Sequence, residues 1–503
     1  MKRSRLALSL AVVVMLASPA AAQKGLTITI APPADAVTMD PGRSTQVLTV
    51  NYFVNLYDTL TRWDNALKLQ PGLATAWKPV GETAWDVTLR SGVKFHDGTP
   101  FTAEDVKAVY ERNLAPGKTV VTAGFATIDR IEVVSPTSLR ITTRKPDPLM
   151  PVRMAQMGGY IYPRRFASDE GAKELARKPV GTGAYKFVEW VKDDRLVMEA
   201  NREWWGWDKK APAIDRIVWK PIPDDFARLS ALQRGEVDVI TNVPPDQMKI
   251  VKTLAVTSSR FAVLSMNTTQ APLSDKRVRQ ALHYALDMPS IVKNLYAGQG
   301  KPFSGGAADT DFGYNAALTP YPYDPAKAKA LLAEGGYAGQ ELTLFAGHGT
   351  MINDKQLLET VADMWTQVGV KVKVEMMEMA RRQKMNNDRA TPPNGMLLGN
   401  PQSTLLDIDG ALWRIFHPNG FNGKYWAENQ PGHRFHDLME QARYTLDQKK
   451  RKEIYTEATR IIHDEKPWIE LFQEVVLYGV SKRVTFKPRA DFRLVASEMT
   501  PAK

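Results

Sequence analysis

A glycine-containing segment is the first place in the sequence where residue types and spacing suggest chemistry. Gly181-Thr182-Gly183 has the glycines of a phosphate-binding loop. Such a loop also needs a Lys-Ser/Thr pair to reach phosphate and metal, and it opens a helix. That pair is missing here, and the residues from Ala184 to Val188 have the pattern of a strand. We therefore interpret the segment as a turn into a strand, not as a nucleotide site.

Two pairs of polar residues could carry metal or acid–base chemistry. His433 and His436 are three residues apart and would share one helical face. Metal sites usually need a third or fourth ligand, and no HExxH motif is present, so we expect no metal. Asp407 and Asp409 are alternate residues, which point to opposite faces of an extended segment. For these two aspartates a helix cap or a loop contact is the favoured interpretation.

The sequence contains no motif of a covalent catalyst. Neither Gly-x-Ser-x-Gly nor Ser-x-x-Lys with its partners occurs. The chain has no cysteine, which excludes disulfides, a thiol nucleophile and a lipid-modified cysteine. We expect no catalytic residue and no cofactor. An exported hydrolase remains an alternative because catalytic triads are assembled in space, and a ligand sensor or chaperone-like partner protein is another.

The N-terminus has the pattern of a secretory signal. Lys2, Arg3 and Arg5 form a basic segment, an apolar stretch follows over 6–16, and the small residues of 20–22 precede Gln23. The apolar stretch is shorter than the ~20 residues that a membrane span needs. We predict a signal peptide over 1–22, cleaved after Ala22, and a free periplasmic protein.

Length and composition fit a globular protein of several domains. With 503 residues, about three domains are expected, and 44% hydrophobic residues allow a large core. The net charge is +11, of which the signal segment contributes three. The basic run 449–452 is interpreted as the solvated face of a helix start. We expect no nucleic-acid partner and a monomer.

Strand-like and helix-like segments alternate along most of the chain. Residues 85–89 alternate as a half-buried strand does, and Thr102 is placed to cap the helix that follows. Further helix starts are predicted at Asp225, Ser274, Asp324 before a proline, and Asn353. Repeated helix–glycine–strand units indicate α/β lobes with mixed sheets.

A set of segments, taken in order, resembles the family 5 extracellular solute-binding proteins, the peptide/nickel class of receptors for ABC importers. The resemblance covers essentially the whole mature chain. The segments are Leu56–Thr61, Gln70–Ala74, Ala76–Trp77, Leu89–Val106, Pro179–Tyr185, Ala200–Gly206, Asp275–Leu282 and Tyr323–Ala328.

The resemblance implies a two-lobed periplasmic-binding-protein fold. Residues 23–51, 180–265 and 476–503 would form the core of the first lobe, 52–179 an inserted subdomain, and 266–475 the second lobe. Two strand crossings, near 263–267 and near 475–478, would form the hinge. The lobes would close on a small-molecule ligand and present it to the permease subunits of an ABC transporter.

The resemblance also implies where a ligand is contacted. The expected residues lie on the first lobe's wall, on the helix entering the subdomain, and on a loop of the second lobe and the segment after it. They are Met157, Gly158, Asn55, Tyr57, Asn400, Gln402, Thr404, Asp407, His417, Asn419 and Asn422.

One position departs from the pattern of the peptide-binding relatives. These relatives carry an aspartate three residues before the position of Asp407, where it pairs with the ligand's amino terminus. Here this position is Thr404. A buried ammonium without a carboxylate partner costs several kcal/mol or more. The sequence therefore favours a neutral or hydroxyl-rich ligand, such as a sugar conjugate or opine-like compound, over a peptide held in the usual way.

Overall fold

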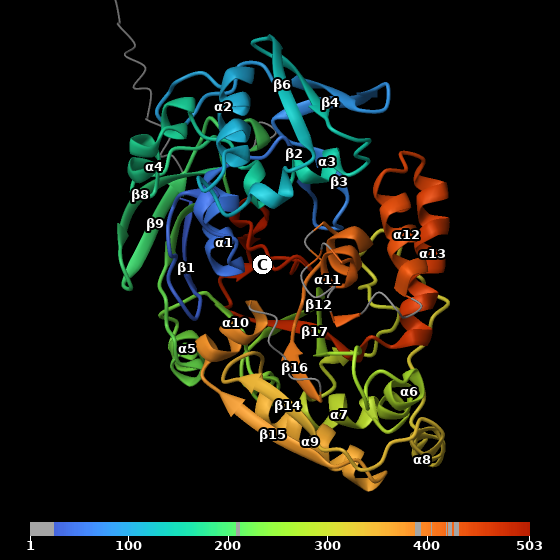
Figure 1. Cartoon of the computed structure of the whole chain (residues 1–503). Coiled ribbons are helices and arrows are strands. Elements are labelled where there is room, and N and C mark those ends of the chain that lie inside the picture. The colour runs from blue at the N-terminus through green and yellow to red at the C-terminus, as the bar shows by residue number, and fades with distance from the viewer. Residues whose placement is uncertain are drawn as a thin grey trace, which may run out of the picture.

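The structure is a computed structural model that describes residues 25–207, 212–387, 394–403, 405–418, 420, 425–426 and 432–502. The signal segment, Thr404, Asn419 and Asn422 lie outside the described residues. Figure 1 shows two lobes, one above the other, with strands β12 and β17 running between them. The predicted mixed α/β fold is confirmed.

One large mixed sheet passes through both lobes. Its first-lobe part contains the parallel neighbours β10, β1 and β11, and its second-lobe part contains β15, β14 and β16. A short strand, Gly300–Lys301 (β13), pairs with β17. In spatial order the main strands are Val372–Met377 (β15), Leu342–Gly347 (β14), Gly395–Gly399 (β16), Thr253–Met266 (β12), Trp468–Val480 (β17), Val239–Thr241 (β11), Leu26–Ala31 (β1), Ile214–Trp219 (β10), Arg195–Ala200 (β9) and Tyr185–Val191 (β8).

A second, antiparallel sheet lies within the predicted inserted subdomain, 52–179. Its strands, in spatial order, are Ala74–Val80 (β4), Ala84–Leu89 (β5), Ser138–Thr143 (β7) and Ile128–Ser135 (β6). Helix Ala103–Leu114 (α2) belongs to the same region. It begins with the predicted cap, because Thr102 and Asp105 form a reciprocal capping box. The other strands and α-helices here are Thr61–Trp63 (β2), Leu69–Pro71 (β3), Met150–Arg153 (α3) and Asp169–Leu175 (α4).

Helices cover the sheet in each lobe. Val47–Leu56 (α1) lies in the upper lobe of Figure 1, and Asp225–Gln233 (α5) contacts β11 and β17. The second lobe contains Lys276–Tyr284 (α6), Met288–Leu295 (α7), Pro325–Glu334 (α8), Asp354–Gln367 (α9), Met379–Asn387 (α10), Arg414–Phe416 (α11), Gly432–Arg443 (α12) and Gln448–Glu465 (α13).

The two long strands that join the lobes change register partway along. Residues 253–257 of β12 pair with 475–479 of β17, and pairing resumes only at Phe261 with Gln473. Beyond this break β12 pairs with β16 of the second lobe, whereas β17 on the near side pairs with β11 of the first. The crossing therefore lies at 258–260 opposite Glu474. The predicted crossing near 263–267 lies just beyond this break, where residues 263–266 of β12 pair with β16. The other, at 475–478, begins one residue beyond Glu474.

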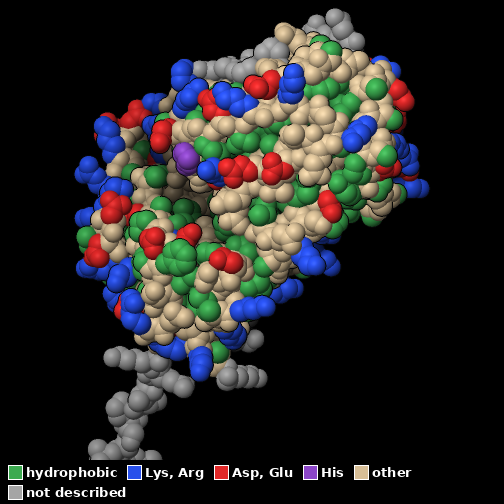
Figure 2. All heavy atoms as spheres, turned by 90° about the horizontal axis from the view of Figure 1, so that it is seen from below, with side chains coloured by type: hydrophobic (Ala, Val, Ile, Leu, Met, Phe, Trp, Pro, Cys, Tyr) green, Lys and Arg blue, Asp and Glu red, His purple; other side chains and the backbone are tan. Residues whose placement is uncertain are grey.

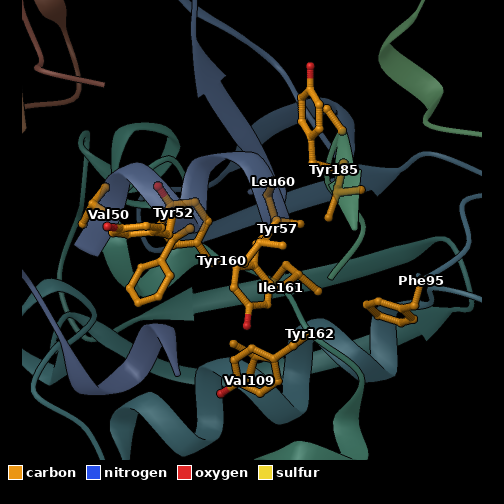
Figure 3. Packing of buried hydrophobic residues seen from close by; sticks show 14 of the residues in the cluster. Val50, Tyr52, Tyr57, Leu60, Phe95, Val109, Tyr160, Ile161, Tyr162 and Tyr185 are labelled. Atoms are coloured by element: carbon orange, nitrogen blue, oxygen red, sulfur yellow. The ribbon is translucent and has the colours of Figure 1, made fainter. Parts of the chain in front are cut away.

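The core of the first lobe draws on both ends of the chain. The largest buried cluster includes Ile28 and the residues of α1, together with Leu494, Ala496 and Met499 from the C-terminal segment. Figure 3 shows aromatic side chains of this cluster gathered close together. The C-terminal segment therefore returns to the first lobe, and its end lies near the middle of the view in Figure 1.

The face of the molecule seen from below is charged (Figure 2), and the described helices lack the length and apolar character of membrane spans. Figure 2 shows acidic and basic side chains interspersed on the face seen from below, which also has a hollow. Within the described ranges, every helix is either too short or too polar to cross a bilayer.

Candidate functional site

A pocket lies where the first lobe, the second lobe and the C-terminal segment meet. The empty space between its walls is about 480 Å³, a value that includes space open to solvent. Three of its walls come from α1 with β2, from the turn before Gly158, and from the loop after β16, and the C-terminal segment supplies the fourth. The lining residues are Val47, Val50, Asn51, Trp63, Gln156, Met157, Gln402, Ser403, Leu406, Asp491 and Arg493.

The wall at Met157 is held in place by its neighbour Gly158. The Asn113 amide donates a hydrogen bond of 2.7 Å to the Gly158 carbonyl. A Cβ on Gly158 would overlap the Phe125 ring. Gly158 is buried and does not line the pocket, whereas Met157 is half-buried and does. Both residues were predicted to contact the ligand, and the structure places Met157 in the pocket lining and Gly158 behind it.

The second-lobe wall is fastened to β12 at the register break. The Gln402 amide donates to the Ser259 hydroxyl at 3.1 Å, and Phe261 N donates to the Pro401 carbonyl at 3.2 Å. Leu406, one of the residues that line the pocket, has a positive φ of 50°. Bulky residues seldom adopt this conformation unless the surrounding structure imposes it.

The C-terminal segment brings a charged group to the pocket that the sequence analysis did not anticipate. Arg489 donates to both carboxylate oxygens of Asp491, at 3.0 and 2.8 Å. Burial raises the pKa of Asp491, but the Arg489 and Arg493 guanidiniums outweigh burial and hold this pKa below its usual value. Asp491 is therefore ionised, and the guanidinium of Arg493 lies beside it, 3.6 Å from its carboxylate.

Two predicted residues of α1 and its end are buried in the first lobe. Asn55 donates to the carbonyls of Asn51 and Leu494 and accepts from Ala496 N, so it holds the C-terminal segment against α1. The Tyr57 hydroxyl donates to the Met39 carbonyl at 2.8 Å, and Figure 3 shows Tyr57 beside Tyr160. Both side chains are about 1% exposed and lie outside the pocket lining.

Asp407 and His417 are also engaged within the protein. Asp407 is buried, pairs with Arg451 at 2.8 Å and accepts from the Tyr455 hydroxyl at 2.9 Å. His417 stacks on Trp413, and its Nε2 is 3.3 Å from Glu440. Asn400 donates to the Thr350 carbonyl at 3.2 Å and lies outside the pocket lining. Of the predicted residues, the structure brings Met157 and Gln402 to the pocket lining, and contact with a ligand stays a prediction for all of them.

His436, Asp407 and Asp409, which were considered for metal or acid–base chemistry, have other contacts, and the side chain of His433 lies outside the described residues. His436 Nε2 lies 3.2 Å from the Phe416 carbonyl. Asp409 begins a π-helical turn, and its backbone N–H donates to the Asp407 carboxylate. Within the described part of the chain, no group of three or more His, Cys, Asp or Glu side chains could hold a metal ion.

Two lobes joined by a pair of strands, with a pocket walled by both, define the class of bacterial solute-binding proteins. The model of the bacterial extracellular solute-binding proteins, family 5, matches residues 68–423, and the chain belongs to this family. It is therefore a non-catalytic, substrate-binding component of an ABC importer.

Similar proteins extend over nearly the whole chain. The glutathione-binding protein GsiB of Escherichia coli (strain K12) is 29% identical over 488 residues, covering 94% of this chain and 93% of the relative. The periplasmic binding protein DppA from Helicobacter pylori, in complex with the peptide STSA, has a TM-score of 0.78 and 25% identity, covering 95% and 98% of the two chains. CtaP from Listeria monocytogenes has a TM-score of 0.85 at 21% identity, covering 95% and 100%.

Proposed function

We propose that this protein captures a small solute bearing a carboxylate, peptide-like or opine-like, between its lobes in the periplasm and delivers it to the permease of its ABC importer. The observation that carries the proposal is the guanidinium of Arg493 in the lining of the interlobe pocket. An arginine binds a carboxylate through two parallel N–H donors, which gives both affinity and orientation.

The contacts of Arg493 leave donors for a ligand. Its Nε lies 3.6 Å from Asp491, and one Nη donates to the Ala155 carbonyl at 3.4 Å. A guanidinium has five N–H donors, so these contacts within the described residues use a minority of them. The side chain is 13% exposed, which places it at the pocket surface and shields it from bulk water.

The charge of the pocket favours a solute of little net charge. Asp491 and Arg493 are its charged lining residues, and they oppose each other. Asn51, Gln156 and Gln402 add neutral amides. A zwitterion could place its carboxylate at Arg493 and its ammonium toward Asp491. This arrangement also fits the names of similar proteins, which include binding of glutathione, of the peptide STSA and, for AgaA from A. tumefaciens R10, of agropinic acid, all carboxylic acids.

Delivery requires that the protein be exported and processed. The N-terminal pattern supports cleavage after Ala22, and periplasmic binding proteins from other bacteria share its fold. The mass of the protein purified from the periplasm should match a chain that begins at Gln23. A mass that retains residues 1–22 would contradict the proposed processing.

The ligand class is tested by native mass spectrometry and by titration. Freshly purified protein is expected to carry a small molecule, and the calorimetric probes are glutathione, a dipeptide and the same dipeptide as its C-terminal amide. Arg493→Gln should weaken binding of the acids about tenfold to a hundredfold, since a hydrogen bond to a charged group contributes about 1.5–3 kcal/mol. Binding of the amide should change little.

The matched control is Arg434→Gln on the exposed face of α12, where the side chain is 59% exposed and pairs with Glu457. This variant should bind as the wild type does. Equal affinity of the wild type for the acid and the amide would overturn the role of Arg493. A protein that binds none of the probes and carries no small molecule would overturn the proposed solute class.

A further inference from the structure

We propose that Arg260 is a positioning residue that couples the hinge to both walls of the ligand pocket. It lies on β12 at the register break between the lobes. The inference deepens the proposed function and rests on it, because the pocket must be the place of capture. It identifies a residue that would act on affinity without lining the pocket.

Arg260 contacts each wall with a different part of the residue. Its backbone forms an isolated antiparallel bridge with Gln402 of the second-lobe loop. Its guanidinium lies 4.4 Å from the ring centroid of Phe492 in the C-terminal segment, which packs on the first lobe. Phe492 stands between Asp491 and Arg493, and these two residues and Gln402 line the pocket. One residue therefore connects walls that move apart when the lobes open.

The same side chain reaches the other hinge strand. Arg260 Nη1 is 3.8 Å from Glu474 Oε2, and Glu474 is the β17 residue opposite the break. Burial raises the pKa of Glu474, and Arg260 and Asn400 oppose this effect. The guanidinium thus stabilises a carboxylate that the hinge buries, at the point where β12 and β17 do not pair with each other.

The stacked ring needs a neighbour to hold it. Phe492 has a φ of +64°, in the left-handed region that bulky residues rarely adopt. Such a residue persists where its surroundings determine it, and the Arg260 guanidinium covers its ring. Opening the lobes would rotate β12 at 258–260 and pull either the stack or the Gln402 bridge apart. Both contacts are made together in this structure, and an opened arrangement is expected to lose one of them.

The test compares Arg260→Met, which removes the guanidinium, with Arg260→Lys, which keeps a cation. The control is Arg165→Met, because Arg165 also stacks on an aromatic ring, Phe166 at 4.2 Å, and pairs with a carboxylate, Asp97 at 2.6 Å, away from the pocket. Thermal unfolding of each variant establishes that it folds.

The first readout is the distance between two spin labels, one on each lobe, in ligand-free protein. The chain has no cysteine, so labels can be attached at Glu82→Cys in the β4–β5 turn and Lys449→Cys on α13. Arg260→Met is expected to shift the distances to longer values and broaden them. Arg260→Lys should retain part of the wild-type distribution, and Arg165→Met should leave it unchanged.

The second readout is the affinity for glutathione, expected to fall about tenfold in Arg260→Met and less in Arg260→Lys. Identical distance distributions in wild type and Arg260→Met would overturn the inference, whether or not glutathione binds. Failure of the wild type to bind glutathione would count against the proposed solute class alone, because the distances are measured without it. If Arg260→Met does not fold, an unchanged distribution in Arg260→Lys would overturn the inference.

Discussion

At the scale of single residues, His96 explains the glycine segment that has the glycines of a phosphate loop. Its Nδ1 accepts from Gly181 N at 3.3 Å, and its Nε2 donates to the Gly183 carbonyl at 3.0 Å. A Cβ on Gly181 would overlap the Leu56 carbonyl at the end of α1. The segment is therefore a structural turn packed against α1, and the strand predicted after it is β8.

This geometry gives the first prediction, a loss of stability in acid that depends on His96. Burial lowers the pKa of His96 to about 4, against 6.5 in the unfolded chain. Between pH 6.5 and pH 4 the imidazole is protonated in the unfolded state and neutral in the folded state. The free energy of unfolding therefore decreases as the pH is lowered, until the folded imidazole is also protonated near pH 4. The total loss should be about 3 kcal/mol.

Urea unfolding between pH 8 and pH 4 measures this loss. The slope of the unfolding free energy against pH gives the number of protons taken up on unfolding, and in His96→Gln this number should be smaller than in the wild type by about one. The variant is expected to be less stable than the wild type at pH 8. Parallel curves for wild type and variant would show that His96 has the same pKa in the folded and unfolded states, which would contradict the prediction. Other buried histidines, such as His283, whose pKa burial lowers well below 6.5, contribute equally to both curves.

Site residues were predictable where the resemblance marks the segment that carries them, and not where a segment distant in sequence reaches the pocket only through the fold. Met157 and Gln402 were placed in the pocket by resemblance, and the structure puts both in its lining. Asp491 and Arg493 were missed, because the C-terminal segment reaches α1 across more than 430 residues of sequence. The one signal was the alternation of charges at 489, 491 and 493, which puts them on one side of an extended segment.

At the scale of elements, local signals predicted the helices well and their first residues less well. Thr102 and Asp324 are the observed caps, as predicted. The caps predicted at Asp225 and Ser274 are wrong by one residue, since Asp224 and Asp275 accept the capping bonds. Neighbouring residues in both pairs are good caps, so only the approach of the preceding chain decides between them. The register break in β12 has no signal in the sequence of that strand, because it depends on which residues of β17 and β16 lie beside it.

The loop that forms the second-lobe wall is tied to α13 by a buried ion pair, and this gives a prediction for an element. Asp407 and Arg451 are about 3% and 4% exposed. Asp407→Asn leaves the guanidinium without its carboxylate and should destabilise the protein by about 3–5 kcal/mol. Arg451→Met together with Asp407→Asn should cost less than the two single changes added. Urea unfolding of the four proteins measures this coupling.

The control for this cycle is the exposed pair Arg434–Glu457, at 2.8 Å between α12 and α13. Glu457→Gln should change stability by less than about 1 kcal/mol. If Asp407→Asn instead abolished solute binding and left stability unchanged, Asp407 would contact the ligand, as the sequence comparison implied. The double variant separates a role in stability from a role in binding, because it removes the unpaired guanidinium but does not restore the carboxylate. It should therefore recover part of the lost stability, and it should not recover binding if Asp407 contacts the ligand.

At the scale of the whole molecule, contacts away from the pocket also join the lobes. Lys145, just after β7 in the subdomain, lies 4.7 Å from the ring centroid of Tyr444 at the end of α12. Arg153 of α3 in the first lobe is close enough to Asp409 of the second to favour its charged form, although burial still raises the pKa of Asp409. These contacts therefore favour the present arrangement of the lobes without a ligand, which reduces what a ligand's own contacts must supply.

The Lys145 contact gives the last prediction, a small and uniform loss of affinity. A cation–π contact at an exposed site contributes about 0.5–1 kcal/mol, so Lys145→Met should shift lobe-to-lobe distances toward longer values and weaken glutathione binding about twofold to fivefold. Lys327→Met is the matched control, because Lys327 lies 4.2 Å from the Tyr284 ring centroid within the second lobe. The control should reduce stability slightly and leave affinity unchanged. Since Lys145 is remote from the pocket lining, the loss should be equal for glutathione and for a dipeptide, and a loss confined to one solute would contradict a role in closure.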